Sequence, residues 1–265
     1  MRRIILLFFI LCAIHQQAAF AQRGTTPADT TSQKNKKGAK TEQQKPKREE
    51  WKLEWNDGME RLDGSLWYVR DFDKGTGSTG YSPAHVFNDN GHLVLMLDTV
   101  NYNDKPFTGA EVAGLKDVGY GKIDVKMRVP KGRGVACAFI ATSLVGADLK
   151  PHDEMSIQFR GTETRSIFFN YFKRKDRMEN GNSYFLPFDA AEEYHVYTIE
   201  WSRKYIKWFI DGKLYYQSYE RIPGSMMRLT FSIWSNMNED HQIDQHAIPA
   251  MFLIDNVKYF IRNHK

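Results

Sequence analysis

Short segments in which apolar and polar side chains alternate recur through residues 51–265, with turn-forming residues between them. Residues 121–129 read Gly-Lys-Ile-Asp-Val-Lys-Met-Arg-Val, a pattern typical of a strand with one buried face. Asp211-Gly212 separates two more such segments and predicts a tight hairpin turn. Further strands are expected at residues 91–97, 197–201, 206–210, 213–216, 226–234 and 251–261. Because no long segment has helical periodicity, the sequence favours an all-β fold, a two-sheet antiparallel β-sandwich or jelly roll.

The first 21 residues have the features of an export signal. Arg2 and Arg3 precede an apolar run at residues 4–14, and residues 19–21 (Ala-Phe-Ala) resemble a cleavage site. The apolar run is shorter than the roughly 20 residues that a membrane-spanning helix needs, so we expect no membrane span. The sequence therefore predicts an exported protein, either periplasmic or secreted.

Residues 22–50 are expected to form a disordered basic linker. They are rich in Thr, Gln, Lys and Pro, and they carry too little apolar surface to offset the entropy of ordering. The chain has a formal net charge of +5. The first 50 residues alone have a net charge of +6, so residues 51–265 have a net charge of −1. A domain without net positive charge is not expected to bind nucleic acid.

Residues 51–265 are predicted to form one domain, since about 215 residues suffice for a single large core. Cys137 is the only cysteine after residue 21, so this domain contains no internal disulfide and depends on its core. The thiol lies in a small, apolar run and is expected to be buried and inert. Trp201 and Trp208 are also expected in the core, and we expect a monomer.

One alternating segment carries side chains suited to chemistry. Within residues 153–159, the side chains of Glu154, Ser156 and Gln158 share one face of the predicted strand. The opposite face is apolar apart from Asp153. Glu154 offers a carboxylate, whereas Gln158 offers an amide that has two N–H donors but no proton to release near neutral pH.

The order of the motifs resembles glycoside hydrolase family 16, closest to the lichenase type of β-glucanase. The family strand reads Asp-Glu-Ile-Asp-Ile-Glu-Phe, and residues 153–159 here read Asp-Glu-Met-Ser-Ile-Gln-Phe. Similar segments follow the family order at residues 109–111, 119–128, 169–171, 188–190, 195–201, 206–212 and 255–259. The resemblance covers about residues 55–262 and implies a jelly roll with a glycan-binding cleft on its concave face.

The resemblance implies retaining hydrolysis of O-glycosidic bonds by two carboxyl groups about 5–5.5 Å apart. Glu154 matches the nucleophile, Ser156 stands at the position of the middle Asp, and Gln158 stands at the position of the acid/base Glu. Loss of general acid catalysis typically costs about 10²–10⁴-fold in rate. We therefore expect a protein that binds a β-linked polysaccharide and hydrolyses it poorly. The alternatives are an active endo-β-glucanase or transglycosylase with an unconventional acid, and a surface-interaction protein whose ligand is not a glycan.

The resemblance also implies a set of substrate-binding side chains: Glu111, His152, Asn170, Phe172 and Trp234. His152 and Phe172 replace a Trp and a Tyr that are common in the family, and Ala113 replaces an Arg. His152 shares the face of Glu154, where it is either a substitute acid, a hydrogen-bonding partner for sugar or an ordinary surface histidine. Trp234 is either a stacking platform for sugar or part of the core.

No cofactor is expected to be required, and a structural calcium ion is the one metal that the resemblance implies. Asp255 and Gly91 match family positions that supply oxygen ligands for Ca²⁺, although a turn aspartate is the alternative. Asp240, His241, Asp244 and His246 lie close together in sequence, and we expect a surface loop there rather than a metal cluster.

Overall fold

The computed structural model describes residues 51–71, 77–102, 104–143, 152–174, 180–236 and 243–263. All of them belong to one compact unit, Glu49–Lys265. The predicted export signal and linker, and the residues Asp240 and His241, lie outside the described residues. In the part of the chain that the structure describes, no helix is long and apolar enough to cross a membrane.

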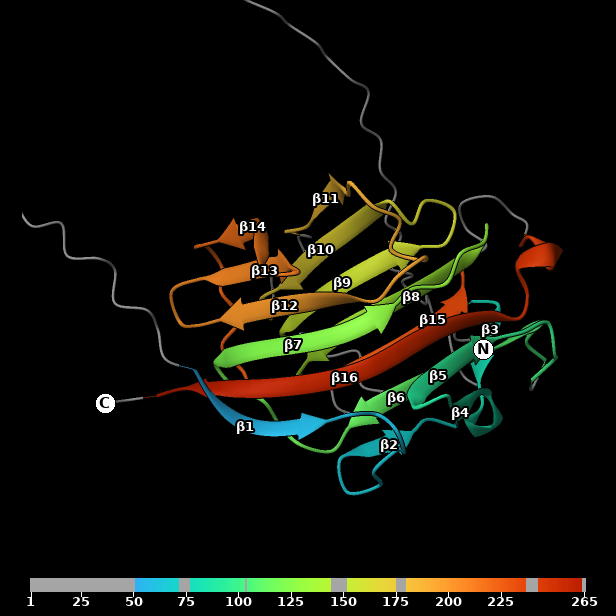
Figure 1. Cartoon of the computed structure of the whole chain (residues 1–265), viewed down its shortest axis with the longest axis horizontal. Helices are drawn as coiled ribbons and strands as arrows, with labels where there is room; N and C mark the ends of the chain where they lie inside the picture. The colour runs from blue at the N-terminus through green and yellow to red at the C-terminus, as the bar shows by residue number, and fades with distance from the viewer. Residues whose placement is uncertain are drawn as a thin grey trace, which may run out of the picture. The chain divides into compact units, whose positions relative to one another are not determined.

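The domain is a sandwich of two eight-stranded sheets (Figure 1). In the first sheet, the strands follow the order β14 (Lys213–Ser218), β13 (Ile206–Ile210), β12 (His195–Trp201), β7 (Gly121–Arg128), β16 (Ala250–Arg262), β5 (His92–Leu97) and β4 (Val86–Asp89). The remaining strand of this sheet, β1 (Trp51–Asp57), pairs with the second half of β16.

In the second sheet, the strands follow the order β11 (Asn182–Phe185), β10 (Ser166–Phe172), β9 (Glu154–Arg160), β8 (Val135–Thr142), β15 (Arg228–Ser235), β6 (Phe107–Gly114) and β2 (Trp67–Val69). The short strand β3 (Thr79–Tyr81) pairs with β6 in parallel, the one departure from antiparallel pairing among the described strands. Two 3₁₀ turns, Pro83–His85 and Gln245–Ala247, are the described helical segments.

The core lies between the two sheets and consists of the alternate side chains that the sequence pattern predicts. Phe231 of β15 packs against Phe252 of β16, with ring centroids 6.3 Å apart. Trp208 and Trp201 are fully buried, as predicted, and Trp208 contacts Phe169 of the second sheet. Burial of large side chains at about 25 cal/mol per Å² of apolar surface is the main stabilising contribution. The all-β sandwich prediction is confirmed.

Two local predictions are also confirmed. Asp211 and Gly212 both have positive φ, 48° and 77°, and they join β13 to β14 as a two-residue hairpin turn. Two consecutive residues with positive φ match the twist of the flanking strands, which explains the Asp-Gly pair. Cys137 is buried on β8, and burial raises the pKa of its thiol, so the nucleophilic thiolate is disfavoured.

Candidate functional site

Strand β9 presents its polar side chains on the face of the second sheet that points away from the core. Met155, Ile157 and Phe159 are buried between the sheets, so the alternating residues face outward. Cross-strand register extends this outward surface over the neighbouring strands. We call it the Glu154 face, and its members include Glu154, Ser156 and Gln158 of β9, Phe168, Asn170 and Phe172 of β10, Ser232 and Trp234 of β15, and Glu111 of β6.

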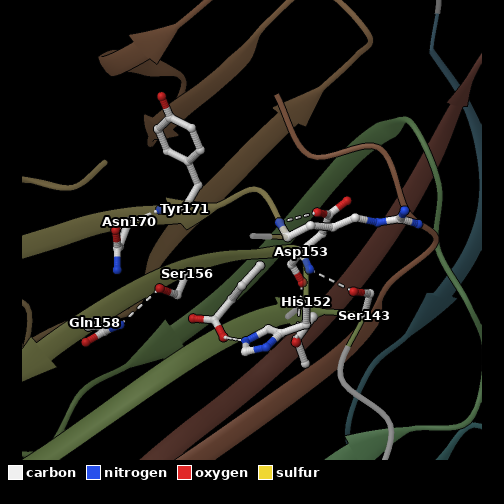
Figure 2. Close-up of polar contacts among 10 residues, drawn as sticks. Ser143, His152, Asp153, Ser156, Gln158, Asn170 and Tyr171 are labelled. Atoms are coloured by element: carbon white, nitrogen blue, oxygen red, sulfur yellow. Dashed lines mark hydrogen bonds and ion pairs between the residues drawn. The ribbon is translucent and has the colours of Figure 1, made fainter. Parts of the chain in front are cut away.

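The Gln158 side chain lies against its neighbour on β9 (Figure 2). Its amide Nε2 donates a hydrogen bond of 3.0 Å to the hydroxyl of Ser156. Ser156 itself is fully buried, whereas Gln158 is partly exposed. The side chains at positions 156 and 158 are therefore in direct contact, and any charge placed on one would act strongly on the other.

Glu154 is in contact with a histidine from its own side of the strand. Nε2 of His152 lies 3.3 Å from Oε2 of Glu154, and both side chains are largely buried, with 24% and 17% of their surface exposed. A retaining acid must face the nucleophile across the scissile bond, at a carboxyl separation of about 5–5.5 Å. The contact between His152 and Glu154 suits a residue that orients the carboxylate better than one that protonates a leaving group.

Asp153 has a structural role that the sequence pattern does not reveal. Its carboxylate is buried, with Oδ1 accepting from the backbone N–H of Arg174 at 2.8 Å. Oδ2 accepts from the backbone N–H groups of Gly224 and Ser225 at 2.7 and 2.8 Å. Burial raises the pKa of Asp153, but these hydrogen bonds outweigh it and hold the pKa below the ordinary value. Asp153 thereby binds the loop at residue 174 and the loop at residues 224–225, and stabilises both next to Glu154.

Glu111 lies on the Glu154 face in an ion pair that sequence reasoning missed. Oε1 of Glu111 is 2.9 Å from Nε of Arg70, which follows β2. Burial raises the pKa of Glu111, and the Arg70 guanidinium opposes that rise. The hydroxyl of Tyr81 accepts a hydrogen bond from Ser232 close by. Arg70 thus brings a guanidinium to the surface beside Ala113, the position at which the resemblance implies an arginine.

The remaining predicted substrate-binding residues occupy different environments on the same face. Asn170 is 2% exposed, and its Oδ1 accepts from the backbone N–H of Tyr171 at 2.9 Å. Phe172 is partly exposed and its ring centroid lies 6.5 Å from that of His152. Trp234 is partly exposed near the end of β15. Phe172 and Trp234 are therefore accessible from solvent on this face, whereas Asn170 is buried and hydrogen-bonded to the backbone of its own strand.

Asp255 does not fit a calcium ligand. It lies at a bulge in β16, and its Oδ2 is 2.8 Å from Nζ of Lys126 while its Oδ1 is 3.0 Å from Nδ1 of His92. Both carboxylate oxygens already face nitrogen atoms, one of them cationic. Gly91 lies in the turn before β5 with φ of 80°. Within the described ranges, no group of three or more His, Cys, Asp and Glu side chains could hold a metal ion.

We expect the thermal midpoint of unfolding to stay unchanged on addition of millimolar Ca²⁺ or of EDTA, measured by differential scanning calorimetry. A ligand that binds only the folded state would raise the midpoint, so a constant value reports no binding. Lys126→Met, which removes the ion pair with Asp255, is expected to lower the free energy of unfolding by no more than about 1 kcal/mol, because this pair is partly exposed to solvent. A Ca²⁺-dependent rise in the unmodified protein would show that the ion displaces Lys126.

Two packed antiparallel sheets, one of which carries polar and aromatic side chains on its outer face, place this protein in the class of β-sandwiches with the jelly-roll arrangement. The profile of the family described as "Glycosyl hydrolases family 16" matches residues 74–249, about two thirds of the chain. The chain therefore belongs to glycosyl hydrolase family 16.

Several relatives carry the name beta-glucanase. The protein from Acetivibrio thermocellus is 29% identical over 204 residues, which cover 75% of this chain and 60% of that protein. This chain thus spans less than two thirds of the length of that relative. The protein from Paenibacillus macerans is 30% identical over 198 residues, 68% of this chain and 80% of its own length.

Solved structures agree on the fold. A prokaryotic β-1,3-1,4-glucanase (lichenase) from a mouse hindgut metagenome superposes with a TM-score of 0.70 at 27% identity, over 77% of this chain and 97% of that one. The laminarinase catalytic domain from Thermotoga maritima gives 0.72 at 20% identity, over 82% of this chain and all of that one, a likeness of fold alone.

Proposed function

We propose that this protein binds a β-linked glucan on the Glu154 face and that retaining hydrolysis there is impaired. The observation that carries the proposal is the amide at position 158, which donates to Ser156 and has no proton to give a leaving sugar. Membership of family 16 supports the ligand class, and relatives named beta-glucanase support a β-glucan in particular.

Among the described residues of the Glu154 face, no second carboxylate lies beside Glu154 at the separation that retaining hydrolysis needs. Glu111 lies on β6, three strands away from β9. At about 4.8 Å per strand, this places it about 14 Å from β9, well beyond the roughly 5.5 Å of a retaining pair. His152 contacts Glu154 itself. These placements favour binding over catalysis.

The second candidate function is an active endo-β-glucanase or transglycosylase that draws its acid from an unconventional source. One observation favours it: Glu154, at the nucleophile position, is retained and partly exposed, with His152 to orient its carboxylate. A third candidate, a surface-interaction protein with a non-glycan ligand, has no feature in the described residues that specifically supports it. We further propose that the chain is exported behind its first 21 residues, periplasmic or secreted, and works as a monomer.

Titration calorimetry and a reducing-sugar assay on the same preparation test the proposal. Mixed-linkage β-glucan, laminarin, agarose and carrageenan are each offered to the unmodified protein. We expect binding of at least one β-glucan and no release of reducing ends at ordinary enzyme rates. Cleavage at such rates that is abolished in Glu154→Ala would establish the second candidate instead. Absence of binding to every polysaccharide would favour the non-glycan alternative.

A further inference from the structure

The flank of the Glu154 face formed by β10 and β11 carries two phenylalanine rings that no role described so far explains. Register places Phe168 of β10 opposite Gln158 on one side and opposite Ser183 of β11 on the other. Phe185 follows two residues after Ser183 on the same face, opposite Ser166. The two rings therefore extend the Glu154 face outward from Gln158 to the edge of the sheet.

The ring of Phe168 occupies the space that a side chain at position 181 would fill, and Gly181 leaves this space open. A Cβ at Gly181 would lie 2.3 Å from Cζ and 2.7 Å from Cε2 of the Phe168 ring, and 3.0 Å from Oδ1 of Asn170. The tip of the ring therefore reaches over the backbone of Gly181, in space that only glycine leaves open. Phe168 remains partly exposed in this position. The exposed part of the Phe168 ring therefore offers an apolar surface against which a ligand can stack.

Phe185 is 69% exposed, so most of its side chain is accessible to a ligand. The guanidinium Cζ of Arg165 lies 5.4 Å from its ring centroid, and Nη2 of Arg165 donates to the carbonyl of Pro187 at 3.1 Å. This second bond fixes the guanidinium, which in turn holds the ring by a cation–π contact. Phe185 is thus an exposed ring with restricted orientation, which lowers the entropy cost of binding a ligand.

We propose that Phe168 and Phe185 form an aromatic platform that extends glucan binding beyond Gln158. A pyranose ring in a β-linked glucan exposes an apolar C–H face and carries its hydroxyl groups at the rim. The platform offers matching chemistry, with two phenylalanine rings for the C–H faces and with Gln158, Ser166 and Ser183 beside them for the hydroxyls. Neighbouring strands lie about 4.8 Å apart, so the platform lies within reach of sugar units that follow one seated at Gln158.

The opposite flank of the Glu154 face, on the side of β6, is polar rather than aromatic, so the two flanks would contact different parts of a sugar chain. There Arg70, Glu111, Tyr81 and Ser232 form a polar cluster joined by an ion pair and a hydrogen bond. A glucan chain lying across the strands would thus meet hydrogen-bonding groups on one side of β9 and apolar rings on the other. The platform inference rests on the proposed function, because it assumes that a glucan occupies this face.

Calorimetric titration with β-glucan oligosaccharides of two and six units tests the platform. Phe168→Ala and Phe185→Ala are each expected to weaken six-unit binding about tenfold, the loss expected when one ring no longer covers sugar. Two-unit binding should be nearly unaffected by Phe185→Ala, because a short ligand need not reach the sheet edge. Gly181→Ala should weaken six-unit binding as well, since its methyl group displaces the Phe168 ring.

Tyr219→Ala is the matched control, because Tyr219 is 61% exposed and directly follows β14 of the other sheet. It should bind the six-unit ligand as the unmodified protein does. Circular dichroism and the thermal midpoint establish that every variant is folded. If Phe168→Ala and Phe185→Ala bind the six-unit ligand with unchanged affinity, the platform is refuted while the proposed function stands. If the unmodified protein binds neither ligand, the proposed function itself fails and the platform with it.

Discussion

The double variant Gln158→Glu/Ser156→Asp is expected to hydrolyse mixed-linkage β-glucan about 10²–10⁴ times faster than the unmodified protein. This range is the usual contribution of a positioned general acid. The substitution returns a proton donor to position 158, four residues from Glu154 on the same strand face. Initial rates of reducing-end release at matched protein concentration measure the effect.

The side-chain contact between positions 156 and 158 explains why both changes are needed. In the protein as it stands, the Gln158 amide lies 3.0 Å from the Ser156 hydroxyl. The Ser156→Asp change would place a carboxylate next to the carboxyl group that Gln158→Glu introduces, and like charges raise the pKa of one member of such a pair. A raised pKa keeps the acid protonated near neutral pH. The hydrolysis rate of Gln158→Glu alone should therefore rise less than that of the double variant.

Two further variants separate this explanation from a general change in affinity. Ser156→Asp alone adds the charge without the acid and should remain inactive. Adding Glu154→Ala to the double variant should remove the gained activity, because the nucleophile position is then empty. If the double variant binds glucan normally and yet stays inactive, position 158 is not what limits hydrolysis, and the impairment must come from elsewhere on the Glu154 face.

The second large effect concerns stability. Asp153→Ala is expected to lower the free energy of unfolding by about 3–5 kcal/mol, because each buried donor left without its partner costs about 1–3 kcal/mol. Three backbone N–H groups, of Arg174, Gly224 and Ser225, would be left without their acceptor. For a domain of this size, about 1 kcal/mol shifts the thermal midpoint by about 2–4 °C, so a fall of about 10 °C is expected.

The same carboxylate predicts a dependence of stability on pH. Because its pKa is lowered in the folded state, Asp153 contributes stability that is fully present above its unfolded pKa of about 3.8. That contribution is lost as pH falls through the folded pKa, which lies lower. Urea unfolding of the protein and of Asp153→Asn should therefore converge in stability as the pH drops below about 4.

Asp117→Ala serves as the control for both measurements. Asp117 pairs with Arg228 at 3.0 Å, but 53% of its side chain is exposed. Exposed pairs contribute about 0–1 kcal/mol, so this variant should unfold close to the unmodified protein. If Asp153→Ala and Asp117→Ala prove equally stable, the hydrogen bonds of Asp153 do not anchor the two loops.

The strands with strict alternation were predictable because one face of each lies in the core. The segment 206–210 has the same bounds in sequence and structure, and the Asp211-Gly212 turn follows from backbone sterics alone. Strands β2 and β3 were not predictable, since each has only three residues. Segments so short acquire strand geometry from pairing with β6, which lies far along the chain.

The common face of Glu154, Ser156 and Gln158 also follows from sequence, because strand alternation fixes it. The contacts that surround these three side chains do not follow from the sequence. Arg70 reaches Glu111 only through the pairing of β2 with β6, and Asp153 finds its donors in loops at residues 174 and 224–225. The resemblance implied Asp255 as a possible calcium ligand, and the contacts with Lys126 and His92 that speak against this role are visible only in three dimensions.

The pairing of β1 with β16 has a consequence for engineering. Trp51, where the described domain begins, lies opposite Arg262, almost where it ends. The start of β1 and the end of β16 therefore lie side by side at one end of the first sheet (Figure 1). Domains with adjacent ends tolerate circular permutation and insertion into loops of host proteins. A short peptide joining the two ends would allow the chain to be reopened at the exposed Asp211-Gly212 turn, remote in sequence from β9.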